Sequence, residues 1–336
     1  MDSLLDSTWC TNWYTKSVMP LLVASRPLER PFLLVRKLRS DASPLLRRTM
    51  MNPNCKTAFA LALAALSCTS FAADWSDTAI SVRYGTQFAE PFNNNPDGSR
   101  NDITKTIVGL THVSGYKYGV NFFNADLLLS DRNDPGDGTP GASGAQEVYI
   151  VYRHLLDFGK VMSKDLKVGP VRGFGFTAGF DWNTKNDGYA SKKRMFVFGP
   201  TVMFDVPGFA NLSLLAFKES NSPKGISDRY TYDTHPALAA EWGIPIGSLP
   251  LAFEGYALYI GDKGTNEFGG PTKPETHIDM KLMLDVGVLA GAPKGTFKVG
   301  LAYEYWKNKF GNPTETPGAG DGATARTPMI RAEYHF

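Results

Sequence analysis

Between Asp74 and Phe336, apolar and polar residues alternate with a period of two, and this pattern constrains the fold more than any other feature. Around residue 178, for example, Phe174, Phe176, Phe180 and Trp182 alternate with Gly, Thr and Asp. Successive side chains of a β-strand point to opposite faces, so such a stretch predicts a strand with one apolar and one polar face. This region has no apolar run of about 18 residues, so it offers no transmembrane helix.

Twelve such segments follow one another and predict twelve strands. They cover residues 76–90, 102–113, 115–130, 146–156, 170–183, 192–206, 209–219, 235–244, 251–261, 275–289, 296–307 and 325–336. Long polar connections alternate with short ones such as Ser114 and Pro207-Gly208, with 157–169 as a longer exception. The third segment changes phase near Phe123, which predicts a β-bulge. Long loops on one side and short turns on the other are typical of outer-membrane barrels.

The expected fold class is therefore all-β, a twelve-stranded antiparallel transmembrane β-barrel of the bacterial outer membrane. A soluble sandwich is the alternative, but it would have to bury many large aromatic side chains. In lipid these side chains can face outward, and backbone groups there must be paired within a closed barrel. We expect aromatic girdles at the two membrane interfaces, formed by Trp75, Tyr84, Tyr116, Trp182, Trp242, Tyr305 and Tyr334.

Residues 51–72 have the features of a secretory signal peptide. Lys56 supplies a basic start, Ala58–Leu66 is an apolar core too short to span a bilayer, and a small-residue cleavage signal ends at Ala72. A short buried helix is the alternative. We expect the barrel domain to comprise residues 73–336.

Residues 1–50 are interpreted as a misassigned upstream extension that is disordered, with a transit peptide as the rival interpretation. Residues 1–72 hold 9 of the 35 Lys and Arg and 4 of the 33 Asp and Glu, so the mature chain has 26 basic and 29 acidic residues. The resulting net charge of −3 does not favour nucleic acid as a partner. Cys10, Cys55 and Cys68 all precede the mature chain, so disulfides and thiolate chemistry are excluded there.

The chain ends on an alternating segment in which Ile330, Ala332, Tyr334 and Phe336 share one face. This ending resembles the C-terminal signal of bacterial outer-membrane proteins, which the assembly machinery recognises through the last aromatic residue. The alternative is an ordinary edge strand. We therefore expect outer-membrane lipid and the assembly machinery, through Phe336, as partners.

Four stretches carry a more specific resemblance: Arg83–Pro91, His112–Asp126, Glu147–Val161 and Gly175–Asp187. In order, spacing and length the chain resembles the Tsx-like outer-membrane channel family, in its divergent "outer envelope protein" branch. The resemblance covers essentially all of the mature chain and implies a twelve-stranded monomeric barrel with a narrow pore for nucleosides. The mature chain has fewer Trp residues than the nucleoside-specific branch, so the resemblance leaves the solute open.

The polar faces of the predicted strands supply candidates for the lumen wall and for weak solute binding. The charged candidates are Arg83, Lys117, Glu147, Arg153, Asp181, Lys193, Asp205, Glu241, Glu254, Asp279, Lys281, Asp285, Lys298, Glu304, Arg331 and Glu333. The aromatic candidates, which would stack on a base or sugar, are Tyr149, Tyr256, Trp306 and Phe123. Because both signs are present, we expect no strongly ion-selective field. The alternative is that these charges only neutralise one another across the lumen.

We expect a passive channel for nucleosides or similar small polar solutes, without enzyme activity, cofactor or metal. A structural or adhesin-like barrel is the alternative. A lipid hydrolase is a further one, because His112 and Ser114 lie two apart on a strand, as in outer-membrane phospholipases. Gly115 replaces the Asn of that pattern, and no orienting partner is evident.

The loop Asp131–Gly138 lacks the ligand positions of an EF-hand, and a solvated loop is expected there.

Overall fold

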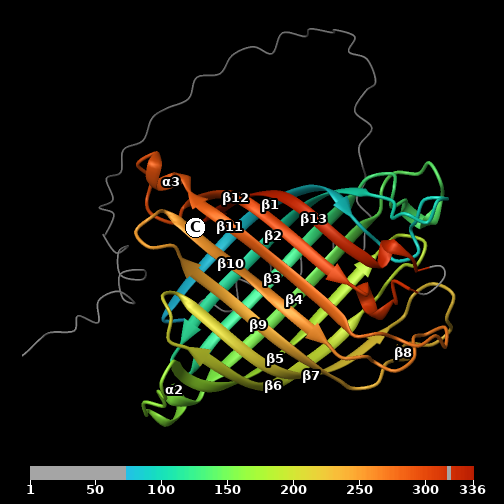
Figure 1. Cartoon of the computed structure of the whole chain (residues 1–336). Helices are drawn as coiled ribbons and strands as arrows, with labels where there is room; N and C mark the ends of the chain where they lie inside the picture. The colour runs from blue at the N-terminus through green and yellow to red at the C-terminus, as the bar shows by residue number, and fades with distance from the viewer. Residues whose placement is uncertain (1–72, 316–318) are drawn as a thin grey trace, which may run out of the picture. The chain divides into compact units, whose positions relative to one another are not determined.

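The computed structural model describes residues 73–315 and 319–336, and these form one antiparallel β-barrel (Figure 1). Its twelve long strands, counted among these residues, are β1 (Trp75–Phe88), β2 (Ile103–Tyr116), β3 (Gly119–Ser130), β4 (Gln146–Asp157), β5 (Val171–Lys185), β6 (Arg194–Phe204), β7 (Phe209–Asn221), β9 (His235–Pro245), β10 (Leu251–Ile260), β11 (Glu275–Asp285), β12 (Phe297–Lys307) and β13 (Thr324–His335). A two-residue strand, β8 (Tyr230–Thr231), pairs with the end of β7. The predicted extension and signal peptide lie outside the described residues.

Every long strand pairs with a neighbour on each side, so the sheet has no open edge. Strand β1 pairs with β13, and β6 pairs with β7, which joins the two ends of the strand order into a ring. In lipid no water can satisfy a free backbone group, so closure is what allows these strands to span a membrane. The predicted twelve-stranded antiparallel barrel is confirmed.

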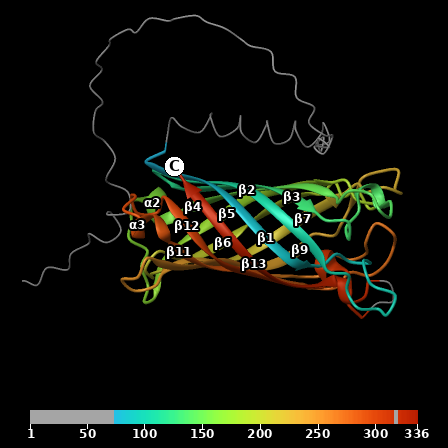
Figure 2. The same ribbon diagram turned by 90° about the horizontal axis from the view of Figure 1, so that it is seen from above.

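The connections differ at the two ends of the barrel, as predicted from their lengths. Figure 1 shows the long connections gathered at one end, here called the loop end. The other end, the turn end, holds the short connections, the C-terminus and the one-turn helices α2 (Phe158–Met162) and α3 (Val286–Leu289). The view from above in Figure 2 shows the same division. The 3₁₀ turns η1 (Gly136–Gly138), η2 (Lys309–Gly311) and η3 (Asp321–Ala323) belong to loop-end connections.

The β6–β7 turn illustrates how sequence fixes a short connection. Pro207 cannot donate a backbone hydrogen bond, and Gly208 adopts a positive φ of 78°. A side chain on Gly208 would also collide with the Gly243 carbonyl, because an added Cβ would lie 2.0 Å from that oxygen. The turn therefore depends on Gly at this position.

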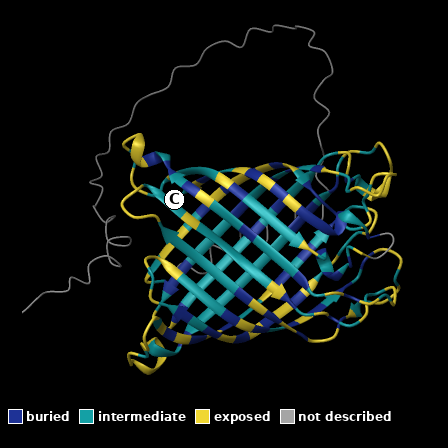
Figure 3. Cartoon of the chain, in the orientation of Figure 1, coloured by how far each residue is buried: buried dark blue, intermediate teal, exposed yellow. Residues whose placement is uncertain are grey.

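The two faces of the wall differ in chemistry. Along the strands, exposed and buried residues alternate (Figure 3). The outward positions carry large apolar side chains, including Leu214 (58% exposed), Leu301 (67%) and Ile330 (61%). A continuous belt of exposed apolar side chains is unfavourable in water and favourable in the hydrocarbon core of a bilayer. The wall is therefore that of a membrane-spanning barrel of the bacterial outer-membrane type. None of the described helices is long and apolar enough to cross a membrane.

Two local predictions are wrong. Ser114 is not a turn but lies inside β2, and the turn that follows is Lys117-Tyr118. The register of β3 runs without a shift through Phe123, so the change of phase in the sequence marks no bulge there. The register shift in this part of the wall instead lies between Gly85 and Phe88 of β1, and it turns Phe88 inward, where it is 3% exposed.

The apolar belt predicts that a charge on the outer face interferes with insertion. Leu214→Arg on β7 should destabilise the folded barrel by about 2–4 kcal/mol if it lies near the bilayer midplane. The measurement is denaturant-induced unfolding in phospholipid vesicles. Phe268→Arg, at an exposed loop-end position, is the matched control and should leave the unfolding free energy within about 0.5 kcal/mol of the wild type. Equal effects of the two substitutions would argue against a lipid-facing β7.

Candidate functional site

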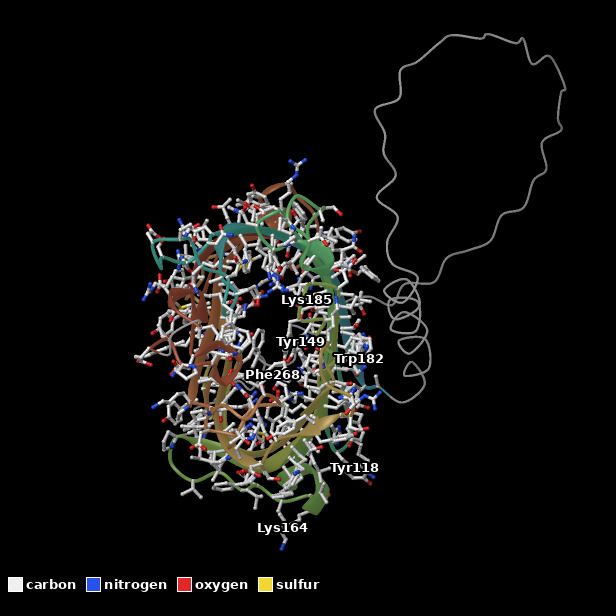
Figure 4. All side chains as sticks on the ribbon, turned by 90° about the vertical axis from the view of Figure 1, so that its right-hand side faces the viewer. Tyr118, Tyr149, Lys164, Trp182, Lys185 and Phe268 are labelled. Carbon is white, nitrogen blue, oxygen red and sulfur yellow. The ribbon has the colours of Figure 1, made fainter. Side chains whose placement is uncertain are left out.

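The lumen is partly filled by two apolar clusters on opposite arcs of the barrel. One contains Met195, Val197, Leu215, Phe217, Ala237, Ala239 and Ile260 from β6, β7, β9 and β10. The other contains Phe88, Ile103, Ile107, Ala302 and Met329 from β1, β2, β12 and β13. Polar walls formed mainly by β4–β5 and β10–β12 remain between them. Figure 4, seen from the loop end, shows an opening between these walls with Tyr149 and Lys185 at its edge.

Arg83 connects strands on both sides of the β1 arc. Its guanidinium forms an ion pair with Asp126 of β3 and lies 3.5 Å from the carboxylate of Asp279 on β11. Arg83 is only 9% exposed, and a buried cation requires such partners. The carboxylates therefore hold the guanidinium against the wall of the lumen.

The β4–β5 wall is built in the same way. Arg153 donates to Asp181 at 2.6 Å, and the Tyr149 hydroxyl donates to the other oxygen of Asp181 at 2.9 Å. Gly179 leaves room for this arrangement, because an added Cβ would lie 3.0 Å from Cδ of Arg153. The pair fixes the Tyr149 ring at the edge of the opening.

The facing wall carries a column of aromatic rings. His277 stacks on Trp306 with ring centroids 3.9 Å apart and an interplanar angle of 7°. Tyr256 meets His277 edge-on at 5.2 Å, and Phe310 meets Trp306 edge-on at 4.8 Å. The Trp306 indole donates to Glu275 at 3.0 Å, which fixes its orientation. The column runs from η2 at the loop end to the middle of β10.

The sequence predicted only Tyr256 and Trp306 of this column. His277 lies directly opposite Trp306 on the neighbouring strand, and this register cannot be predicted from the alternation within one strand. Phe310 lies in a connection that alternation does not describe. Lys309 beside it is buried and lies over both the Trp306 and Phe310 rings, at 5.1 and 5.2 Å from their centroids.

At the loop end, Glu90 is the centre of a buried ionic cluster. Its carboxylate lies 2.6 Å from the ammonium of Lys105, 3.5 Å from that of Lys185 and 3.3 Å from that of Lys309. Burial raises the pKa of Glu90, but the three lysines outweigh it and hold the pKa well below the ordinary glutamate range. Asp134 adds a second carboxylate, 3.0 Å from Lys185. Asp134 is 4% exposed although it belongs to Asp131–Gly138, the loop that the sequence predicts to be solvated.

A second set of contacts joins the loops on the opposite arc. Lys263 lies 3.0 Å from Glu219 and 3.8 Å from Glu275. Glu267 accepts hydrogen bonds from the hydroxyls of Tyr189 and Tyr232, and burial raises the pKa of both hydroxyls. The β10–β11 loop is thereby tied to the β5–β6 and β7–β9 connections.

The structure places most of the predicted lumen candidates on the inner face of the wall. By their register with buried inward residues these are Arg83, Glu147, Tyr149, Arg153, Asp181, Glu241, Glu254, Tyr256, Asp279, Lys281, Lys298, Glu304, Trp306, Arg331 and Glu333. Lys193, just before β6, joins them through its ion pair with the buried Glu219, at 3.6 Å. Near the turn end, Lys281 lies 3.0 Å from Glu254 and 2.7 Å from Glu333. Arg331 also pairs with Glu333.

Three candidates lie outside the lumen, and a fourth, Asp285, lies opposite Lys298 at the turn end, where it acts as a helix cap. Lys117 is exposed in the β2–β3 turn, where its ammonium lies 4.9 Å from the centroid of the Tyr118 ring. Asp205 is exposed in the β6–β7 turn and pairs with Lys167. Phe123 shares the outer face with its cross-strand partner His112. Asp285 caps α3 at the turn end, accepting from Val288 N at 3.3 Å and Gly295 N at 2.6 Å.

The residues of the hydrolase alternative face away from the lumen. His112 shares the outer face with Thr78, whose hydroxyl lies 2.8 Å from its Nδ1 atom. Within residues 73–315 and 319–336, no hydrogen bond joins His112 to Ser114, as a serine nucleophile and its base require. In the same residues no group of three or more His, Cys, Asp or Glu side chains is arranged to hold a metal ion.

Comparisons with known proteins do not assign a family to the chain. No protein-family model matches the chain, and no curated protein matches it. Among solved structures, an outer-membrane channel of Pseudomonas putida F1 is similar with a TM-score of 0.45 and 10% identity, over 80% of this chain and 98% of that one. The KdgM porin is similar with a TM-score of 0.38 and 9% identity, over 77% and 99%.

The translocator domain of the autotransporter NalP from Neisseria meningitidis is also similar, with a TM-score of 0.40 and 8% identity, over 84% of this chain and 96% of that one. None of these similarities bears on the solute. The strand pairing and the apolar belt of the chain itself identify it as an outer-membrane barrel.

The Glu90 cluster predicts a pH-dependent stability. Glu90→Gln should destabilise the barrel by about 3–5 kcal/mol at neutral pH, because it leaves buried lysines without their shared carboxylate. Because the pKa of Glu90 is lower in the folded than in the unfolded protein, its ionised carboxylate stabilises the fold at a pH above the unfolded pKa. This stabilisation is lost as the pH falls from the unfolded pKa through the folded pKa. The difference between wild type and variant, measured by denaturant unfolding, should therefore shrink on acidification below about pH 4.3.

Asp97→Asn is the matched control, since Asp97 lies in the same β1–β2 loop with a fully exposed side chain. It should leave the stability at neutral pH unchanged. A Glu90→Gln barrel as stable as the control would contradict the proposed role of the cluster.

Proposed function

We propose that the barrel is a passive outer-membrane channel for nucleosides or similar small polar solutes, which bind weakly as they pass. The observation that carries this proposal is the aromatic column of Tyr256, His277, Trp306 and Phe310 on the inner face of β10, β11 and β12 and in η2. A planar base or sugar face stacks on such rings, while neighbouring charged groups are placed to contact hydroxyls.

The lumen supports passage of small solutes rather than large ones. A barrel of about 8 strands is filled by side chains and one of 16–18 holds a wide channel, so twelve strands correspond to an intermediate bore. The two apolar clusters narrow this bore further on opposite arcs. The resemblance to the Tsx-like family supports nucleosides as the first class of solute to test.

The proposal includes a route to the membrane. Residues 51–72 would direct export and be removed, and Phe336 would engage the outer-membrane assembly machinery. Phe336 is 67% exposed at the turn end, and its ring lies beside that of Tyr334 at a centroid distance of 6.3 Å. An exposed terminal aromatic ring on the outer face suits recognition during assembly.

The test is single-channel conductance of the protein purified from outer membranes, in a planar bilayer, with and without adenosine or thymidine. We expect discrete openings that nucleoside reduces. Openings that do not change when nucleoside is added would contradict nucleosides as the solute class but would be consistent with a channel. A correctly folded barrel without conductance would contradict transport and favour the structural or adhesin-like alternative.

The aromatic column predicts which residue controls the block. Trp306→Ala should weaken the nucleoside block while openings persist, because about 1–3 kcal/mol of stacking per base is lost, a roughly 5- to 150-fold change in affinity. Trp182→Ala is the matched control, since Trp182 is a β5 residue on the outer side of the wall (Figure 4). Equal weakening by both substitutions would contradict binding at the column.

A further inference from the structure

The positive charges of the lumen are neutralised by neighbours. Each Arg or Lys on the inner face has a carboxylate oxygen within 4.0 Å, and these residues are Arg83, Lys105, Arg153, Lys185, Lys193, Lys263, Lys281, Lys298, Lys309 and Arg331. A paired charge contributes little to the potential felt by an ion several ångströms away. The selectivity of the lumen therefore depends on the charges that remain unpaired.

Two inward carboxylates have neither an ion pair nor a hydrogen bond among the described residues. Glu241 of β9 and Glu304 of β12 form no ion pair and no hydrogen bond among the described residues, and both side chains are partly exposed on the inner face. Glu147 also lacks an ion pair, but it is buried and accepts a hydrogen bond from Asn183 at 2.6 Å. Glu241 and Glu304 thus differ from the other inward acids by facing the lumen unpaired.

The register sets these two residues in one row across four strands. Glu241 lies opposite Tyr256, Tyr256 opposite Asp279, and Asp279 opposite Glu304. The row crosses the wall between the loop-end and turn-end clusters. Of its carboxylates, Asp279 is paired with Arg83, so Glu241 and Glu304 leave an excess of negative charge at this level.

The row also contains an unfavourable contact. Asp279 and Glu304 are direct cross-strand partners, and like charges in that position destabilise a sheet. Across the lumen, Arg153 and Glu241 interact electrostatically, but Arg153 is already bonded to Asp181.

We infer that Glu241 and Glu304 determine the charge preference of the channel and make it favour cations and amine-bearing solutes over anions. A ring or row of carboxylates in a narrow pore attracts cations and repels anions. Phosphorylated solutes would then pass more slowly than their uncharged parent nucleosides. The inference rests on the proposed function, since it needs an open channel.

The experiment is the reversal potential across a planar bilayer under a KCl gradient, with the protein purified from outer membranes. We expect K⁺ to be several-fold more permeant than Cl⁻ in the wild type. The ratio of K⁺ to Cl⁻ permeability should fall toward unity in the double variant that carries both Glu241→Gln and Glu304→Gln. The conservative variant Glu304→Asp should retain the cation preference. Single-channel conductance of each variant shows that the pore is intact.

Asp165→Asn is the matched control, because Asp165 is exposed at the turn end outside the lumen, and it should leave the ratio unchanged. Equal permeability of K⁺ and Cl⁻ in conducting wild-type channels would overturn the inference but not the proposed channel function. A cation preference that persists in the double variant would also overturn the inference. Folded barrels without any conductance would instead overturn the proposed function.

Discussion

Pairing of every long strand with two neighbours is the constraint on which this structure depends. A bilayer offers no hydrogen-bond partner to a free N–H or C=O group, so the β1–β13 and β6–β7 pairings are as necessary as any hairpin. Closure then fixes one face toward lipid and one toward the lumen along each strand. A slip of one residue in any strand would exchange the two faces, and the apolar belt opposes such a slip.

Inside the ring, the lumen is shaped by two kinds of contact. Apolar side chains pack on opposite arcs and narrow the bore, whereas ion pairs such as Arg83 with Asp126 and Arg153 with Asp181 hold the polar walls in place. Loop-end residues take part as well, since Glu90 forms ion pairs with Lys105 of β2, Lys185 of β5 and Lys309 of η2. The loops are therefore part of the wall and not a separate cover.

The strands could be predicted from the sequence because alternation is a local signal that barrel closure reinforces. Arg83 and Tyr256 were assigned to the inner face for the same reason. Contacts that depend on register or on loop conformation could not be predicted. Nothing in the local pattern indicates that His277 stacks on Trp306 or that Glu90 folds inward, because these contacts join segments far apart in the chain.

Lys117 shows the converse limit. The sequence predicts the turn at Ser114, whereas β2 continues to Tyr116 and the turn is Lys117-Tyr118, so a shift of three residues moves Lys117 from a polar face to an exposed turn. The sequence signal for a two-residue turn without Gly or Pro is weak. Boundaries were therefore least predictable at the turn end, where connections are shortest.

The shared carboxylates of the lumen have a consequence for how this protein can change over evolutionary time. Asp126 and Asp279 both form ion pairs with Arg83, so replacing Arg83 alone would leave two carboxylates without this partner. Homologues that lose this arginine should therefore have replaced both acids together, and the three positions should vary as a unit. Outer-face positions such as Leu214 are free of this coupling and should drift individually among apolar residues.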